Sequence, residues 1–313
     1  MSKKNVSAWN ALQPGDLIDV IAPGSRCSDQ ELEKGVKTLE AWGYRVRVDS
    51  KIFGPDVICA NTDAERFRQL KKALLAKDSK AIWCARGGYG AIRFTEELKK
   101  LKKPKNTKLL IGYSDVTTIH HFLNQFWKWP SLHGPLLDRV GRGDAHPDEI
   151  QELKAVLKGE QSEVVFSKLI PMNKMAEKKR TIKATVCGGN LMVVNSTLGG
   201  AFQKPFPGIV FLEDRGERGY RVDRLLKQME LAGSFKQAKA IVLGDFVGGL
   251  EADGKDMVTP ILQRFADEIK IPMFKGVEAG HGEKQRAIFF NTPAELVGGS
   301  QASLKIYTGA AKR

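Results

Sequence analysis

Alternation between short apolar runs and amphipathic segments most constrains the first part of this 313-residue chain. Two capping-box patterns, Ser28 with Glu31 and Thr62 with Glu65, predict helices that end near residues 43 and 75. The apolar runs that fit strands are 17–22, 44–48, 81–85 and 109–111. Strands that alternate with helices form a parallel sheet with helices packed on its faces, so this part is predicted to be an α/β domain.

A polar stretch separates this region from a second one. Residues 139–180 are rich in lysine and predict a linker with one short helix near 149–157. The alternation then resumes, with strands at 208–212, 240–243 and 287–290 and helices at 190–198, 222–231 and 259–269. Because 313 residues exceed the usual size of one hydrophobic core, we expect two domains. Their predicted bounds are 1–140 and 183–313, joined by a linker at 141–182.

Composition indicates the class of protein and the compartment in which we expect it. Apolar residues make up 42% of the sequence and charged residues 27%, as in ordinary globular proteins. The four cysteines lie far apart, and Cys84 and Cys187 fall inside apolar runs, which favours free buried thiols in a reducing compartment. No apolar signal region follows the N-terminal lysines, and no stretch approaches 18 uninterrupted apolar residues. We therefore expect a cytoplasmic protein that does not bind membranes.

The net charge of +14 raises the question of nucleic-acid binding. The densest basic stretches are Lys99–Lys105 and Lys174–Lys183, and lysines dominate both. Neither interleaves aromatic residues with its lysines, as a stacking platform for single strands would. We therefore expect solvated basic surface and no nucleic-acid partner. Such a surface would also attract peptides rich in carboxylates.

Three turns follow predicted strands, at residues 22–25, 86–90 and 112–115. In a parallel sheet, ligands bind beyond the carboxyl ends of the strands, so these turns are the candidate site. Ser114 lies between a strand and a helical pattern at 116–126, as the serine of a nucleophile elbow does, although the second glycine of G-x-S-x-G is absent. The alternative is a serine that caps the helix. The Gly87-Gly88 pair could cradle an oxyanion or could be a structural turn.

Two further residues could carry chemistry. Glu213 ends an apolar strand pattern, where a carboxylate could hold a histidine ring or could pair with the arginines that follow it. His281 lies between two glycines, which indicates an accessible loop. His133 could line the same cleft as Ser114. None of the histidines has H-x-x-x-H spacing, and the cysteines form no ligand pair, so we expect no metal and no cofactor.

Taken together and in order, these segments resemble the serine LD-carboxypeptidase family, which includes murein tetrapeptide carboxypeptidases and microcin C immunity peptidases. The likeness runs from about Gly15 to Leu304. It rests on a set of short motifs: Gly15-Asp16, Ala22-Pro23-Gly24-Ser25, Arg86-Gly87-Gly88-Tyr89-Gly90, Gly112-Tyr113-Ser114-Asp115, His133-Gly134-Pro135, Gly188-Gly189-Asn190-Leu191, Leu212-Glu213-Asp214 and Gly280-His281.

The resemblance implies a Rossmann-like N-terminal domain and a smaller, β-rich C-terminal domain, with a cleft between them and a homodimeric assembly. It implies Ser114 as nucleophile, Glu213 as the acid and His281 as the base. Gly88 and Asp115 would supply backbone amides to an oxyanion. Arg86 could grip a substrate carboxylate or could form a structural ion pair.

The implied reaction is release of D-alanine from murein tetrapeptides through an acyl-enzyme, which makes a muropeptide the expected partner. One alternative is cleavage of peptidyl or aminoacyl nucleotides, and another is a non-catalytic protein that binds anions. Gly24 stands where the family commonly has serine, which puts the role of that turn in doubt. Glu217 lies close enough to be mistaken for the acid, and Glu213 is preferred because it directly follows the strand.

Overall fold

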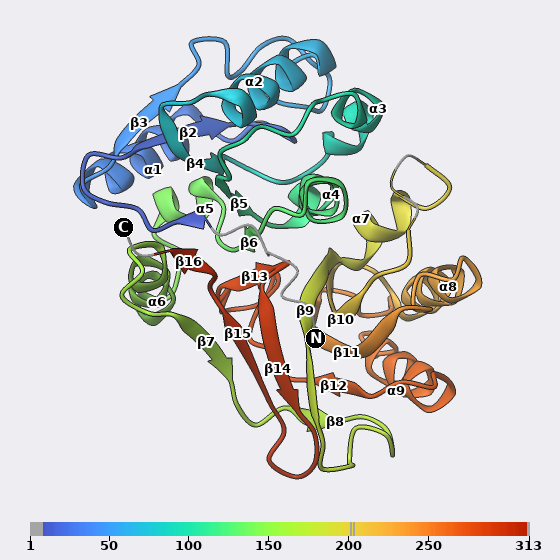
Figure 1. The fold of residues 1–313 in the computed structure, drawn as a ribbon. Coiled ribbons are helices and arrows are strands. Elements are labelled where there is room, and N and C mark those ends of the chain that lie inside the picture. The colour runs from blue at the N-terminus through green and yellow to red at the C-terminus, as the bar shows by residue number, and fades with distance from the viewer. Residues whose placement is uncertain (1–8, 201, 203, 312–313) are drawn as a thin grey trace. The chain divides into compact units, whose positions relative to one another are not determined.

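The structure is a computed structural model that describes residues 9–200, 202 and 204–311. The chain divides into two compact units (Figure 1). The first unit comprises residues within 1–162, 286–291 and 308–313, and the second comprises 163–285 and 292–307. This division differs from the predicted bounds because the strand at 288–290 pairs in the sheet of the first unit, and because the predicted linker contains regular structure.

The first unit is built around a sheet that has six strands among the described residues, in the order β13-β6-β5-β4-β2-β3. All neighbours are parallel except β13, which is antiparallel to β6. The strands of this unit, including the separate pair β1 and β16, are β1 (Trp9–Asn10), β2 (Leu17–Ile21), β3 (Arg45–Val48), β4 (Ser79–Cys84), β5 (Leu109–Gly112), β6 (Ser131–His133), β13 (Ile288–Phe290) and β16 (Ala310–Ala311).

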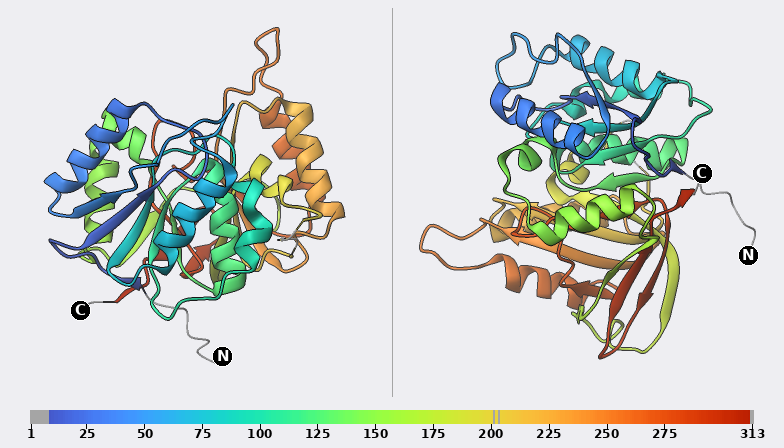
Figure 2. Two further views of the ribbon diagram at one scale, coloured as in Figure 1. Left: turned by 90° about the horizontal axis from the view of Figure 1, so that it is seen from above. Right: turned by 90° about the vertical axis from the view of Figure 1, so that its left-hand side faces the viewer.

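The helices of the first unit connect these strands. The α-helices are α1 (Asp29–Ala41), α2 (Asp63–Leu75), α3 (Thr95–Lys99), α4 (Thr117–Phe122), α5 (Leu137–Arg142) and α6 (Pro147–Leu157). The chain moves from β2 to β3 in one direction and returns to β4 in the other. Because such crossovers are right-handed, α1 and α2 lie on opposite faces of the sheet (Figures 1 and 2). The reversal makes the carboxyl ends of β2 and β4 a topological switch point.

The second unit contains a larger mixed sheet. Its order among the described residues is β7-β15-β14-β9-β10-β11-β12-β8, with a parallel centre from β9 to β12 and antiparallel strands on both sides. The strands are β7 (Glu163–Phe166), β8 (Ile170–Pro171), β9 (Thr181–Asn190), β10 (Gly208–Arg215), β11 (Ala238–Val247), β12 (Met273–Lys275), β14 (Pro293–Val297) and β15 (Ser303–Tyr307). Among the described residues of this unit, three helices pack beside the parallel centre: α7 (Leu191–Ser196), α8 (Gly219–Leu231) and α9 (Val258–Glu268).

The expected fold class is confirmed: a parallel sheet with helices on both faces, and a second, β-rich unit. Among the described residues, no helix is long and apolar enough to cross a membrane. All four cysteines are buried and free of disulfides, as expected.

Candidate active site

Ser114 occupies a strained turn directly after β5. Its φ is 63°, in the left-handed region that side chains other than glycine and asparagine seldom adopt. A 3₁₀ turn, Ser114–Val116, then leads into α4. The capping residue of this turn is Tyr113, whose side chain makes no capping hydrogen bond. Ser114 is therefore not the residue that caps this turn. Strain of this kind collects at functional residues and is typical of a nucleophile elbow.

Gly112 makes room for the larger residue that replaces the second glycine of the elbow motif. The position two residues after the serine is Val116, which is fully buried. A Cβ atom on Gly112 would lie 3.0 Å from Val116 Cγ2 and 3.0 Å from Cys84 Cβ. The bare backbone at 112 therefore makes room for the valine, and the sharp turn survives without glycine at 116.

The glycine loop after β4 lies against Ser114. A Cβ atom on Gly87 would stand 2.9 Å from Ser114 Cβ and 3.2 Å from its Oγ. The Gly87 carbonyl accepts a hydrogen bond of 2.8 Å from the amide of Ser25, and the Ser25 hydroxyl accepts one of 3.1 Å from the amide of Tyr89. The three turns predicted at the carboxyl ends of the strands therefore meet, as expected. Gly88, whose φ is +78°, lies directly over Ser25.

Asp115 fixes the far end of this loop through its side chain. Its buried Oδ2 accepts a 2.9 Å hydrogen bond from the amide of Ala91. Burial raises the pKa of Asp115 to about 6, and the amide donors of Ala91 and Gly90 oppose that rise. The sequence singled out only the backbone amide of Asp115. Its carboxylate also ties the helix start after Ser114 to the segment after the glycine loop.

Arg66 is a buried anchor that sequence reasoning missed. Its side chain is fully buried in α2, its Nη1 donates to the carbonyl of Pro23, and its Nε donates to the carbonyl of Asn61 at 2.9 Å. It thereby holds the 22–25 turn. The helical spacing of positions 66, 70 and 73 already placed Arg66 on the buried stripe of α2, which was the signal available in the sequence.

Arg86 forms the ion pair that was one of its two expected roles. Its Nη1 lies 3.3 Å from Oδ2 of the buried Asp138, which also pairs with Arg142. The Arg86 side chain nevertheless remains 42% exposed. Its guanidinium is thus accessible to a ligand, and a role in binding a substrate carboxylate stays a prediction.

In the second unit, His281 and Glu213 form a close pair. The distance from His281 Nδ1 to Glu213 Oε2 is 2.7 Å, the carboxylate is fully buried, and the imidazole is 11% exposed. A carboxylate at Nδ1 favours the tautomer that carries its proton there, which leaves Nε2 able to accept one. Glu217, the competing acid, instead pairs with Arg221.

Two glycines and an unpredicted aspartate shape the His281 loop. A Cβ atom on Gly280, whose φ is +132°, would lie 2.9 Å from Glu213 Oε2, and one on Gly282 would lie 2.5 Å from Asp245 Oδ2. The amide of Gly282 donates to Asp245 Oδ2 at 3.2 Å. Burial raises the pKa of Asp245 to about 6, and the Glu213 carboxylate adds to the rise. Asp245 follows an apolar run as Glu213 does, and this parallel could have identified it.

The remaining histidines of the first unit lie in its core. His133 is fully buried in β6, with its ring 5.7 Å from that of Tyr113 and 5.6 Å from that of Phe290. The expectation that His133 lines a cleft with Ser114 is therefore not met by its buried position. His120 and His121 fall within α4, and burial lowers the pKa of each. Within the described ranges, no group of three or more His, Cys, Asp or Glu side chains could hold a metal ion.

Gly87 offers a test of the packing around Ser114. We expect Gly87→Ala to lower kcat/KM by about 10²-fold, because the new methyl group would displace the Ser114 hydroxyl and small misplacements cost about that much. The matched control is Gly200→Ala, where the new Cβ would meet nothing closer than a carbonyl at 3.4 Å. Steady-state kinetics on both variants checks this. Equal activity in the two variants would contradict the close approach.

Asp214 gives a pH-dependent prediction about stability. Burial and the Glu213 carboxylate raise its pKa to about 7, although the amides of Arg215 and Met192 donate to it. The folded state thus binds a proton that the unfolded state releases between about pH 4 and 7, so this group's contribution to stability is lost as the pH rises through that window. Relative to wild type, Asp214→Asn should gain roughly 1–3 kcal/mol in unfolding free energy from pH 4.5 to 7.5. Urea unfolding at both pH values measures this, and parallel pH profiles would refute it.

Comparison with known proteins gives the class of protein. The first unit has a strand-to-helix turn with a serine in the left-handed region, and the second has a histidine held by a buried glutamate. Models of the LD-carboxypeptidase N-terminal and C-terminal domains match residues 18–134 and 183–296. The chain belongs to the LD-carboxypeptidase family and is a peptidase.

Individual relatives agree with this assignment. A Rickettsia conorii protein, whose carboxypeptidase name is provisional, is 33% identical over 90% of this chain and 87% of its own. The crystal structure of muramoyltetrapeptide carboxypeptidase from Oxalobacter formigenes is 26% identical, covers 93% of this chain and 98% of its own, and has a TM-score of 0.76. The microcin C7 self-immunity protein, at 18% identity, covers 96% and 98% with a TM-score of 0.79 and shows a shared fold alone.

Proposed function

We propose that this protein is a serine-type carboxypeptidase that hydrolyses the bond before the terminal D-alanine of murein tetrapeptides. The observation that carries the proposal is the left-handed backbone at Ser114, beside a glycine loop that leaves room for its hydroxyl. The name of the Oxalobacter formigenes relative supports the substrate class. The four free thiols are in keeping with the reducing cytoplasm, where fragments of the cell wall would be recycled.

The proposed reaction proceeds in two steps. A serine hydroxyl is a weak nucleophile at neutral pH, so His281 Nε2 would accept its proton as Ser114 Oγ attacks the carbonyl carbon. The amides of Gly88 and Asp115 would donate to the oxyanion. The carbon–nitrogen bond then breaks, and the imidazolium returns its proton to the departing amine of D-alanine. Water, activated by the same imidazole, hydrolyses the ester and frees the tripeptide, while Glu213 fixes the ring and stabilises its charge.

Mass spectrometry of a defined tetrapeptide tests the proposal. Incubation with the purified protein should convert it to a tripeptide and free D-alanine, and a chelator should leave the rate unchanged. An aminoacyl nucleotide is offered in a parallel reaction. Cleavage of the nucleotide alone would replace the murein assignment with the microcin-immunity type. Loss of the tetrapeptide activity on chelation would overturn the serine mechanism, and inertness toward both substrates would favour a protein that only binds anions.

A further inference from the structure

One cavity of the first unit lies at the opposite end of the sheet's strands from Ser114. Its volume is about 320 Å³, within the range of small-molecule sites. Ser79 begins β4 and Lys108 immediately precedes β5, so the cavity is at the amino ends of these strands, whereas Gly87 and Ser114 follow their carboxyl ends. The five-residue step from 108 to 113 along an extended strand spans roughly 16 Å. Its lining residues are Asn10, Lys77, Ser79, Lys80, Lys105, Asn106, Thr107 and Lys108.

The residues that line this cavity carry an excess of positive charge. Four of its lining residues are lysines, and none is a carboxylate. Among the described residues, no carboxylate lies within ion-pair distance of Lys77, Lys80 or Lys105. Lys105 is also the last residue of the densest basic stretch in the sequence, which the proposed peptidase reaction does not use.

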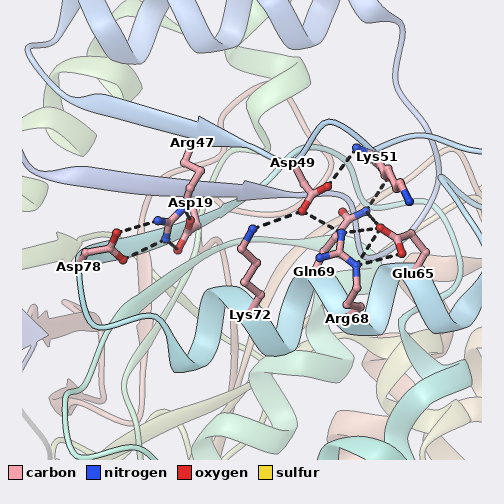
Figure 3. Close-up of polar contacts among 9 residues, drawn as sticks. All are labelled: Asp19, Arg47, Asp49, Lys51, Glu65, Arg68, Gln69, Lys72 and Asp78. Atoms are coloured by element: carbon pink, nitrogen blue, oxygen red, sulfur yellow. Dashed lines mark hydrogen bonds and ion pairs between the residues drawn. The ribbon is translucent and has the colours of Figure 1, made fainter.

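A neighbouring cavity of the same volume provides the contrast. It lies between α2 and the β2–β3 edge, and two of its lining residues are cations and two are carboxylates. Arg47 bridges Asp19 at 2.6 Å and Asp78 at 2.7 Å, and Lys72 lies 3.7 Å from Asp49, as Figure 3 shows. Its cations therefore pair with acids of the chain itself, and of these two cavities the lysine-lined one is the one whose described lining residues carry an excess of positive charge.

Lys108 forms the buried floor of that cavity. The residue is 3% exposed, and its Nζ donates to the carbonyl of Ala73 at 2.6 Å and to the hydroxyl of Ser79 at 2.7 Å. The Ser79 hydroxyl in turn donates to Asp19 at 2.5 Å. Burial lowers the pKa of Lys108 to about 8, the carboxylates of Asp19 and Asp78 oppose this change, and the cations of Arg47 and Lys80 add to it. Capping the end of α2 accounts for Lys108, but it does not account for the other three lysines.

We propose that this lysine-lined cavity is a binding site for a small phosphate-bearing ligand. Lysines act as point charges that suit phosphate, and several of them around one cavity favour a compact anion with more than one charge. A single carboxylate would leave most of this charge unbalanced. The amides of Asn10 and Asn106 and the hydroxyl of Thr107 supply further donors at the rim. The site lies apart from the proposed catalytic residues.

Calorimetric titration of the full chain with pyrophosphate at low salt tests this inference. We expect one site per chain, and at least a tenfold loss of affinity in the Lys80→Ala, Lys105→Ala double variant. Neither of these two lysines is buried, so the variant should fold, and thermal unfolding verifies it. The matched control is Lys174→Ala with Lys178→Ala, which removes the same charge from exposed positions in the second unit and should bind as wild type does.

Parallel titrations with inorganic phosphate and with a nucleoside diphosphate identify the source of the phosphate. Tighter binding of the diphosphate than of pyrophosphate assigns the site to nucleotides, and the reverse assigns it to free phosphates. The inference is overturned by absence of binding at millimolar pyrophosphate, by equal losses in the two double variants, or by binding only of an oligonucleotide. The tetrapeptide assay is independent of these outcomes, so the failure of either proposal can be recognised separately.

Discussion

Replacing Ser114 with alanine should lower kcat/KM for the tetrapeptide by about 10⁴–10⁶-fold, because removal of the hydroxyl abolishes the covalent route and leaves only binding and oxyanion stabilisation. The substitution keeps the Cβ atom, so the left-handed turn and its contact with Gly87 should persist. Thermal unfolding should change little. Release of D-alanine, followed by mass spectrometry, measures the loss.

The control for this variant is Ser167→Ala, which removes an exposed hydroxyl from the second unit. It should retain wild-type kinetics. A Ser114→Ala protein with activity within tenfold of wild type would exclude Ser114 as the nucleophile, whatever the packing around it.

Glu213→Gln should produce the second-largest effect, a fall in kcat of about 10³–10⁴-fold with little change in KM. The glutamine has nearly the same shape but no charge to stabilise an imidazolium, and its amide can donate to Nδ1 and so favour the wrong tautomer of His281. The buried position gives the new side chain little freedom to move away. Steady-state kinetics over a range of tetrapeptide concentrations separates kcat from KM.

Glu230→Gln is the matched control for this change. Glu230 lies on α8 of the same unit and pairs with Lys227, so its loss should leave turnover within about twofold, as for most surface ion pairs. Equal kinetics for Glu213→Gln and Glu230→Gln would mean that the buried carboxylate only packs against the ring. The base would then need no acid to hold it.

Local signals in the sequence predicted most of the first unit. Apolar runs and helix caps gave β2 to β5 and the first two helices, and the full capping box at Ser28 is present. At Thr62 only half of the box forms, because Glu65 pairs with Arg68 instead of with the capping amide. The helix predicted at 116–126 is real but runs through 3₁₀, α and π turns, a detail that periodicity alone does not encode.

Long-range pairing was the part that local patterns could not give. The strand Ile288–Phe290 pairs with Ser131–His133, more than 150 positions away, and so joins the first unit instead of the second. The strands 293–297 and 303–307 form a local hairpin that the sequence analysis missed. The pairing of this hairpin with 181–190 on one side and 163–166 on the other is again long-range. Their pairing depends on tertiary contacts, since strand propensity is strongly dependent on context.

The candidate site was also predicted only in part. Motifs in order predicted Ser114, Glu213 and His281, and the structure places the side chains of the last two in contact. The catalytic roles of all three stay predictions. Side chains that act through burial were missed, namely Arg66 under the 22–25 turn and Asp245 beside Gly282. Both side chains hydrogen-bond to backbone groups that come close to them only in the folded chain, so the sequence alone does not reveal these contacts.

The covalent intermediate provides the most direct test of the central claim. The protein is mixed with a tetrapeptide whose last bond is an ester, quenched in acid during turnover, digested and mapped by mass spectrometry. We predict the tripeptide acyl group on the peptide that contains Ser114, and no acyl group when Ser114 is replaced with alanine. Turnover of the tetrapeptide with no acyl group on Ser114 at any quench time would contradict the account.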